Sequence, residues 1–340
     1  MAAMVIVFYH AHYYVAPYLP APLNSFIRHG NLAVDMFFVL SGFVLYLNYA
    51  GRVSTSWPDM ASFMKKRIAR VYPLHILMLG CFLAFGLAVA LKHGDWPAFM
   101  PLDYFLLSLF LLQNVGFTDI LAWNVPAWSI STELIAYILF PFFLAVFRMA
   151  DRRTGTLFAI IAAATSLLYV FFWVTGWPFP DDIQRNGLMR CLTQFVIGMA
   201  TCELYVRGTV DQRSGAVAGL VAALCLSLLV YDTQSPVVPI LWCSLIMALT
   251  QWTRLNPLLW RPLVYLGDIS YAIYLSHYFL LIVFKYLFVT EDRTTSIPAL
   301  ALYLATVFAV SIVLYHFWER PAQKIILGRR NRPAKPLPAP

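Results

Sequence analysis

Charged side chains are scarce in this sequence. Only 12% of its 340 residues are Asp, Glu, Lys or Arg, whereas about 25% is usual for a soluble domain. Hydrophobic residues make up 61%, and the mean hydropathy is +0.71. The net charge of +8 does not indicate nucleic-acid binding, because the basic residues collect in short loops between apolar runs. The composition excludes a soluble globular domain and predicts a polytopic membrane protein.

Motifs for metals, nucleotides and soluble hydrolases are also missing. The five cysteines lie in apolar runs without a CxxC pair or Cys/His ligand spacing, so neither a disulfide framework nor a metal site is expected. There is no Walker lysine loop, GxGxxG, GxSxG or HExxH. No permanently bound cofactor is expected. No secretory signal with a small-residue cleavage site precedes the first apolar run, which is expected to remain as the first helix.

Ten apolar runs are close to the roughly 20 residues that cross a bilayer. The predicted fold class is all-α, a polytopic integral membrane helical bundle. A further apolar piece, Leu102 to Val115, has only about 14 residues, which is the length of a re-entrant or interfacial segment. The predicted spans cover residues 1–17, 32–50, 70–91, 127–147, 156–175, 188–206, 214–231, 236–252, 263–288 and 297–318.

The basic residues set the predicted orientation. With ten crossings and a cytoplasmic N-terminus, most Lys and Arg side chains fall in cytoplasmic loops, and a crossing by the short piece would invert the later loops. The positive-inside rule thus favours ten spans, both termini in the cytoplasm and one transmembrane domain over residues 1–327. Residues 328–340 are predicted to form a disordered, basic, Pro-rich cytoplasmic tail. The basic residues expected on the outer side are Arg28, Lys92, Arg185, Arg190 and Arg293.

Three ionisable side chains inside apolar runs are functional candidates, because a charge buried in lipid costs about 2.5–3.5 kcal/mol or more. Asp35 lies about one turn inside the second span and is expected to face protein or water. His10 and Glu133 are both expected near the middle of the membrane. A carboxylate can orient an imidazole and raise its basicity, so an approach of Glu133 to His10 is predicted. The alternatives are a histidine bonded to a nearby carbonyl and a carboxylate paired with another span.

Polar side chains also recur at helical spacing. Ser129 follows Trp128 and lies one turn before Glu133 on the same helix face. In GDISYAIYLSH, the polar stripe includes Ser270, Tyr274 and His277. Such residues can also serve as hydrogen-bonding contacts between transmembrane helices, and that alternative stays open.

A basic block, FMKKRIARVYP, closes the second span. Arg67 and Arg70 are three residues apart and share a helix face, and Pro73 marks where that helix can bend. Positive-inside charge alone explains basic residues here. A pair of guanidinium groups also suits phosphate recognition, so a phosphate-bearing cytosolic ligand is the alternative.

The motifs FYHAHYY, VDMFFVLSGF, KKRIARVYP, WSISTE, GDISYAIYLSH and WERP together resemble the membrane acyltransferase-3 family. They occur in the family's order between positions 8 and 321. The resemblance implies a bacterial inner-membrane, multi-pass enzyme with ten or eleven spans. Such enzymes use cytosolic acetyl-CoA, or another acyl-CoA, to O-acylate sugars of exported glycans such as lipopolysaccharide O-antigen or exopolysaccharide. Glycan-assembly proteins are expected partners.

The resemblance also implies roles for single residues. It makes His10 the catalytic histidine and Arg67 with Arg70 the pair that holds the CoA end. Family members usually carry an arginine eleven positions before the histidine, which here would fall upstream of Met1. Three explanations for the missing arginine stay open: a misassigned start, a truncated chain or an inactive scaffold. The residues that match other motif positions are Asp35, Glu133, Ser270, Tyr271 and His277, and the further candidates for substrate binding or structural polar contacts are Trp128, Ser129 and Tyr274.

The implied reaction moves an acyl group from a CoA thioester, entering from the cytoplasm, to a sugar hydroxyl on the outer side. His10 is expected to act as general base and Glu133 to orient it. A covalent acyl-enzyme remains an open alternative. A transporter or flippase with mid-membrane proton-relay residues is the rival from another class, although no inverted repeat is found. A succinyl donor or a small-molecule acceptor is the nearer rival.

Overall fold

Helices form all the regular secondary structure in the part of the chain that is described. The computed structural model describes residues 2–149, 153–177, 179, 182–209, 211–231, 237–251, 259–289 and 295–328, and within these ranges it contains no strand. The predicted all-α fold class is confirmed. The predicted disordered tail, residues 328–340, lies outside the described residues except for Gly328.

Fifteen α-helices occur in the described ranges, joined by short 3₁₀ turns and one π-helix, Tyr315–Glu319. They are α1 (Ala2–His10), α2 (His12–Val15), α3 (Ala21–Arg28), α4 (Ala33–Tyr49), α5 (Trp57–His93), α6 (Leu102–Leu109), α7 (Trp128–Met149), α8 (Thr154–Thr175), α9 (Ile183–Val206), α10 (Gln212–Tyr231), α11 (Val238–Gln251), α12 (Arg261–Asp268), α13 (Ser270–Phe288), α14 (Ile297–Leu314) and α15 (Arg320–Leu327).

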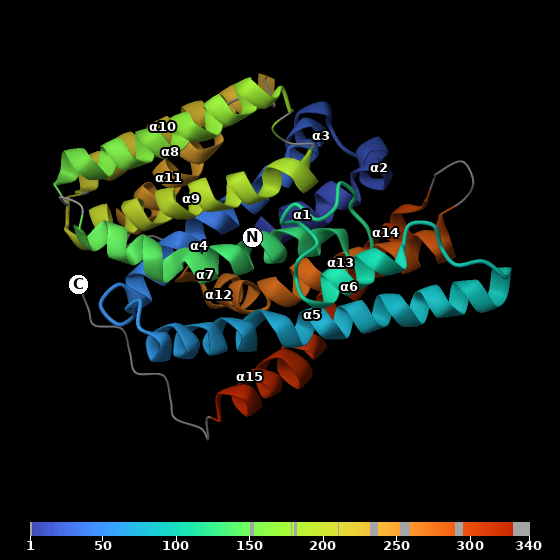
Figure 1. Cartoon of the computed structure of the whole chain (residues 1–340). Coiled ribbons are helices and arrows are strands. Elements are labelled where there is room, and N and C mark those ends of the chain that lie inside the picture. The colour runs from blue at the N-terminus through green and yellow to red at the C-terminus, as the bar shows by residue number, and fades with distance from the viewer. Residues whose placement is uncertain are drawn as a thin grey trace.

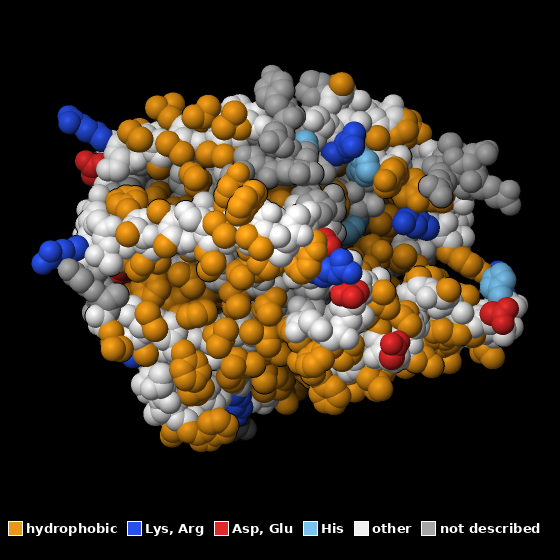
Figure 2. Space-filling view, turned by 45° about the horizontal axis from the view of Figure 1, so that its top comes forward, with side chains coloured by type: hydrophobic (Ala, Val, Ile, Leu, Met, Phe, Trp, Pro, Cys, Tyr) orange, Lys and Arg blue, Asp and Glu red, His pale blue; other side chains and the backbone are white. Residues whose placement is uncertain are grey.

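Six helical segments of the described chain are long and apolar enough to cross a membrane. Figure 2 shows hydrophobic side chains over much of one face, as expected of a surface that meets lipid. Helix α6 has eight residues, about 12 Å, which is too short to cross and agrees with the predicted re-entrant or interfacial segment. The total of ten spans and the side on which each terminus lies stay predictions. The six segments are Gly30–Tyr49, Trp57–His93, Val125–Met149, Thr154–Thr175, Ser270–Phe288 and Ile297–Leu327.

Two predicted spans are not continuous helices. The helix expected over residues 1–17 stops at His10, and Ala11 has φ −89° and ψ 2° before the short α2 begins. The helix expected over residues 263–288 is broken at Ile269, which separates α12 from α13. Both predictions of an unbroken helix are wrong. Hydropathy reports how apolar a window of residues is and does not register a break that is confined to one residue.

Helices α4 and α9 lie in direct backbone contact near the centre of the molecule (Figure 1). A Cβ atom added at Gly42 would overlap the carbonyl oxygen of Phe195, and one added at Gly198 would overlap that of Val39. Small residues at such crossings let transmembrane helices approach closely. The two glycines therefore set the distance between the helix that carries Asp35 and the helix that carries Arg190.

The segment between α6 and α7 is irregular, with buried residues near each end and a mostly exposed middle at residues 116–120. Leu111 and Trp123 have positive φ angles of 57° and 56°, although neither is glycine. The carbonyl of Leu111 accepts a hydrogen bond from Ser131 Oγ at 2.7 Å, and Asn124 Nδ2 donates to the Leu275 carbonyl at 3.0 Å. Irregular backbone at membrane depth is tolerated where protein groups satisfy it. This segment leads into the first turn of α7, where the candidate site begins.

Candidate active site

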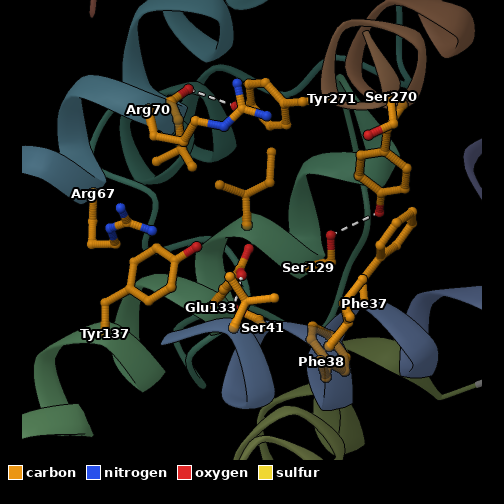
Figure 3. Close-up of a pocket in the computed structure, with 15 residues that line it drawn as sticks. Phe37, Phe38, Ser41, Arg67, Arg70, Ser129, Glu133, Tyr137, Ser270 and Tyr271 are labelled. Atoms are coloured by element: carbon orange, nitrogen blue, oxygen red, sulfur yellow. Dashed lines mark hydrogen bonds between the residues drawn. The ribbon is translucent and has the colours of Figure 1, made fainter. Parts of the chain in front are cut away.

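A cavity of about 240 Å³ lies between α4, α5, α7 and α13. We call it the arginine cavity, because Arg67 and Arg70 both line it. Figure 3 shows Arg67, Tyr137 and Glu133 on one side of this cavity, and Ser129, Phe37 and Ser270 on the other. The predicted shared face of Arg67 and Arg70 is therefore confirmed, as is the shared face of Ser129 and Glu133.

The two arginines have different neighbours. Arg67 Nη2 donates to Tyr49 Oη at 3.2 Å, and its guanidinium carbon lies 5.9 Å from the centre of the Tyr137 ring. Arg67 Nε is buried and has no hydrogen-bond partner among the described residues. Arg70 forms an ion pair with Glu319 and lies 5.4 Å from the centre of the Tyr271 ring. Two guanidinium groups thus reach one cavity. The paired N–H donors of a guanidinium group suit phosphate oxygens.

Glu319 comes from the WERP motif, and its role as the partner of Arg70 was not predicted. It ends the π-helix Tyr315–Glu319, and its side chain is 1% exposed. Trp318 Nε1 in the same turn donates to the carbonyl of Pro73 at 2.9 Å. A π-helix is often found at functional sites. Here the wider turn brings the C-terminal motif against the arginine helix α5.

Glu133 belongs to the arginine cavity. Its Oε1 accepts a hydrogen bond from Ser41 Oγ of α4 at 2.6 Å. Among the described residues, neither a hydrogen bond nor an ion pair joins Glu133 to His10. The predicted approach of Glu133 to His10 is wrong, because Glu133 points to the α4–α5 side of α7 whereas His10 lies on the other side. Depth along a span, which led to that prediction, does not specify the direction in which a side chain points.

A second cavity, of about 390 Å³, is lined by His10. We call it the histidine cavity. The aromatic rings of Trp128, Tyr274 and Tyr278 line it, and Lys285 lies at its border. His10 is the last residue of α1, and a helix C-terminus favours a positive charge by about 0.3–1 kcal/mol. The break after His10 therefore places the imidazole at the end of α1, in a cavity that Lys285 also lines.

The neighbour that the structure gives to His10 is His277. The two ring centres are 5.3 Å apart. His277 is fully buried, and its Nδ1 lies 3.1 Å from the carbonyl oxygen of Ile273. Tyr278, the next residue of α13, packs edge-on against His10 with 5.1 Å between the ring centres. The predicted polar stripe on α13 thus serves two places. Ser270 lines the arginine cavity, Tyr274 lines both cavities, and His277 lies beside His10.

Tyr274 and Ser129 lie between the two cavities, and we call this pair of residues the wall. Tyr274 lines both, and its hydroxyl lies 2.7 Å from Ser129 Oγ and donates to the carbonyl of Pro126 at 2.8 Å. Ser129 lines the arginine cavity, whereas Trp128, one residue earlier, lines the histidine cavity. Pro126 in the preceding 3₁₀ turn starts α7 at this point. The WSISTE motif therefore presents one face to each cavity.

Asp35 forms a buried ion pair close to this wall. Its carboxylate accepts two hydrogen bonds from Arg190, at 3.1 Å from Nε and 2.6 Å from Nη2, and a third from Gln194. Asp35 and Arg190 are 0% and 1% exposed. The guanidinium also lies 5.8 Å from the centre of the Trp128 ring. Arg190, predicted to lie on the outer side, is therefore a buried partner of Asp35; the carboxylate inside the second span was the signal that a cation had to lie nearby.

No group of His, Cys, Asp and Glu side chains in the described ranges could hold a metal ion. The polar chemistry of the two cavities is supplied mainly by guanidinium, ammonium, carboxylate, hydroxyl and imidazole groups. This set can bind an anionic ligand on one side of Tyr274 and move a proton on the other.

Comparisons with known proteins match this arrangement to one family. A family model described as "Acyltransferase domain" matches residues 1–316. Acyltransferase MdmB of Streptomyces mycarofaciens is 30% identical over 92% of this chain and 85% of its own length. The exopolysaccharide production protein ExoZ of Rhizobium meliloti is 25% identical over 90% of this chain and 95% of its own.

A third relative is longer than this chain. The peptidoglycan O-acetyltransferase OatA of Listeria monocytogenes is 23% identical over 95% of this chain, which spans 54% of that protein. No solved structure matches the chain.

Proposed function

The chain belongs to the acyltransferase-3 family, and on that premise we propose that it is a membrane O-acyltransferase. The donor is a cytosolic acyl-CoA, with acetyl-CoA as the first choice, and the acceptor is a hydroxyl of a carbohydrate such as an exopolysaccharide, a lipopolysaccharide O-antigen or another exported glycan. The names of ExoZ, an exopolysaccharide production protein, and OatA, a peptidoglycan O-acetyltransferase, support a glycan acceptor and an acetyl group. The proposed location is the bacterial inner membrane, with ten spans and both termini in the cytoplasm.

The observation that carries this proposal is the pair of cavities on either side of Tyr274. Arg67 and Arg70 offer charge-assisted hydrogen bonds to phosphate oxygens of CoA. Arg70 is 37% exposed at its side chain, so this cavity is within reach of a soluble ligand. The thioester end of the donor then points toward the wall at Tyr274 and Ser129. The aromatic rings of the histidine cavity suit the apolar faces of a sugar.

In the proposed reaction, His10 takes the proton of the acceptor hydroxyl while the hydroxyl oxygen attacks the thioester carbonyl carbon. The new C–O bond forms and the C–S bond breaks. His10 then returns the proton to the departing sulfur, so that CoA leaves as a thiol. A general base of this kind typically contributes about 10²–10⁴-fold to the rate. The lysine at the border of the cavity, Lys285, can stabilise negative charge on the carbonyl oxygen.

The test is acyl-CoA turnover by the purified protein in lipid. Radiolabelled acetyl-CoA is supplied, and both released CoA and label on the protein are measured for the wild type and His10→Ala. The expected result is turnover that falls by about 10²–10⁴-fold in His10→Ala. His93→Ala is the matched control, because His93 is exposed and lines neither cavity. Full turnover by His10→Ala would overturn the role of His10, and a parallel assay with succinyl-CoA identifies the donor.

A further inference from the structure

His277 has a fixed proton position. Its Nδ1 lies 3.1 Å from the carbonyl oxygen of Ile273, one helical turn earlier. A carbonyl can only accept, so Nδ1 carries the hydrogen. In a neutral imidazole the other nitrogen, Nε2, then has a lone pair and can only accept. The helix backbone of α13 thus determines which face of His277 is an acceptor.

No hydrogen-bond partner for that acceptor is present among the described residues. His277 Nε2 is buried and makes no hydrogen bond to any described residue. A buried polar atom without a partner costs about 1–3 kcal/mol, so it needs an explanation. Tyr303 Oη bonds the backbone carbonyl of His277 and therefore does not satisfy the ring.

The group that can supply the missing hydrogen is His10. Its ring centre is 5.3 Å from that of His277, a separation at which ring edges are within hydrogen-bond reach after a small rotation. Tyr278, whose ring packs edge-on against His10 at 5.1 Å, and Lys285, which lines the same cavity, are also near His10. A histidine whose second nitrogen is hydrogen-bonded is held in one tautomer and one orientation.

We propose that His277 is a positioning residue for His10, and this inference rests on the proposed function. His277 Nε2 accepts the N–H of one His10 nitrogen and leaves the other His10 nitrogen, with its lone pair, facing the cavity. When His10 takes the proton of the acceptor hydroxyl, the same hydrogen bond stabilises the imidazolium. The proton goes from the hydroxyl to His10 and then to the thiolate of CoA. His277 neither gains nor loses a proton, and it fills the orienting role that was predicted for Glu133.

Two amide variants separate this role from a purely structural one. In His277→Asn the side-chain NH₂ lies near the position of Nδ1 and keeps the bond to Ile273, but nothing replaces Nε2. In His277→Gln the side-chain oxygen reaches the position of Nε2 and keeps an acceptor for His10. We expect kcat to fall about 10²-fold in His277→Asn with KM for the acyl-CoA unchanged, and less than about tenfold in His277→Gln.

If His277 had only a structural role, the bond to Ile273 alone would matter. In that case kcat would fall more in His277→Gln than in His277→Asn. Equal kcat in His277→Asn and the wild type, or equal losses in the two variants, would overturn the proposal. Thermal melting in detergent shows whether each variant is folded.

A second readout does not depend on turnover. In ¹⁵N-histidine NMR of the protein in lipid, the His10 signals are identified by their loss in His10→Ala. The wild type should show one tautomer of His10, and His277→Asn a mixture of two. A mixture in the wild type would overturn the proposal. A fixed tautomer in a protein that does not turn over any acyl-CoA would instead leave this contact standing and contradict the proposed function.

Discussion

The two cavities differ in chemistry although they share Tyr274. The arginine cavity combines two guanidinium groups with Glu133 and the hydroxyls of Ser41 and Tyr137. The histidine cavity combines imidazole, aromatic rings, Lys285 and Arg190, whose guanidinium is paired with Asp35, and no carboxylate is among the described residues that line it. One side is therefore suited to holding an anion, and the other to moving a proton beside a ring-shaped ligand. The contrast suggests that recognition of the donor and activation of the acceptor are separate tasks of separate residues.

The largest expected effect comes from removing the buried ion pair of Asp35 and Arg190 beside the histidine cavity. Asp35→Ala leaves the buried guanidinium of Arg190 without its bidentate partner. Breaking such a buried pair costs about 3–5 kcal/mol. We expect a marked fall in the melting temperature of the detergent-solubilised protein and loss of turnover, because Arg190 packs on Trp128.

The double variant Asp35→Ala/Arg190→Ala is the matched control for that prediction. It removes both charges, so it should be more stable than Asp35→Ala alone. If Asp35→Ala melts like the wild type, the ion pair does not support the wall between the cavities.

A smaller effect is expected at the wall itself. Tyr274→Phe removes the hydroxyl that bonds Ser129 and the Pro126 carbonyl but keeps the ring. A neutral hydrogen bond contributes about 0.5–1.5 kcal/mol, so turnover should fall roughly 2- to 10-fold. The control is Tyr72→Phe, which loses a hydroxyl bonded to the Leu109 carbonyl outside both cavities. An equal fall in both variants would show that the wall has no special part in turnover.

Much of the fold could be predicted because hydropathy is averaged over about 20 residues, the length of a membrane-spanning helix. Each predicted span contains a helix in the described chain, and helical spacing correctly placed Arg67 with Arg70 and Ser129 with Glu133 in one cavity. The breaks at Ala11 and Ile269 could not be predicted in the same way. Each involves a single residue, and neither carries a glycine or proline at the break.

The pairing of side chains between helices was the harder part. Arg190 was assigned to the outer end of its span from the basic-residue count, and its ion pair with the buried Asp35 was not predicted. Glu133 was paired with His10 because both lie at mid-span, yet they are on opposite sides of the wall at Tyr274. Such pairings depend on the rotation of each helix and on close crossings such as Gly42 with Gly198, and one sequence does not specify these.

The most direct test of two separate tasks is equilibrium binding of CoA to the protein in lipid discs. We expect Arg67→Ala to weaken binding about 10- to 100-fold, the loss of a charge-assisted hydrogen bond of about 1.5–3 kcal/mol, and His10→Ala to bind like the wild type. Lys65→Ala, an exposed basic residue of the same helix outside the cavity, should also bind like the wild type. Equal weakening in His10→Ala and Arg67→Ala, or unchanged binding in Arg67→Ala, would contradict the assignment of the donor to the arginine cavity.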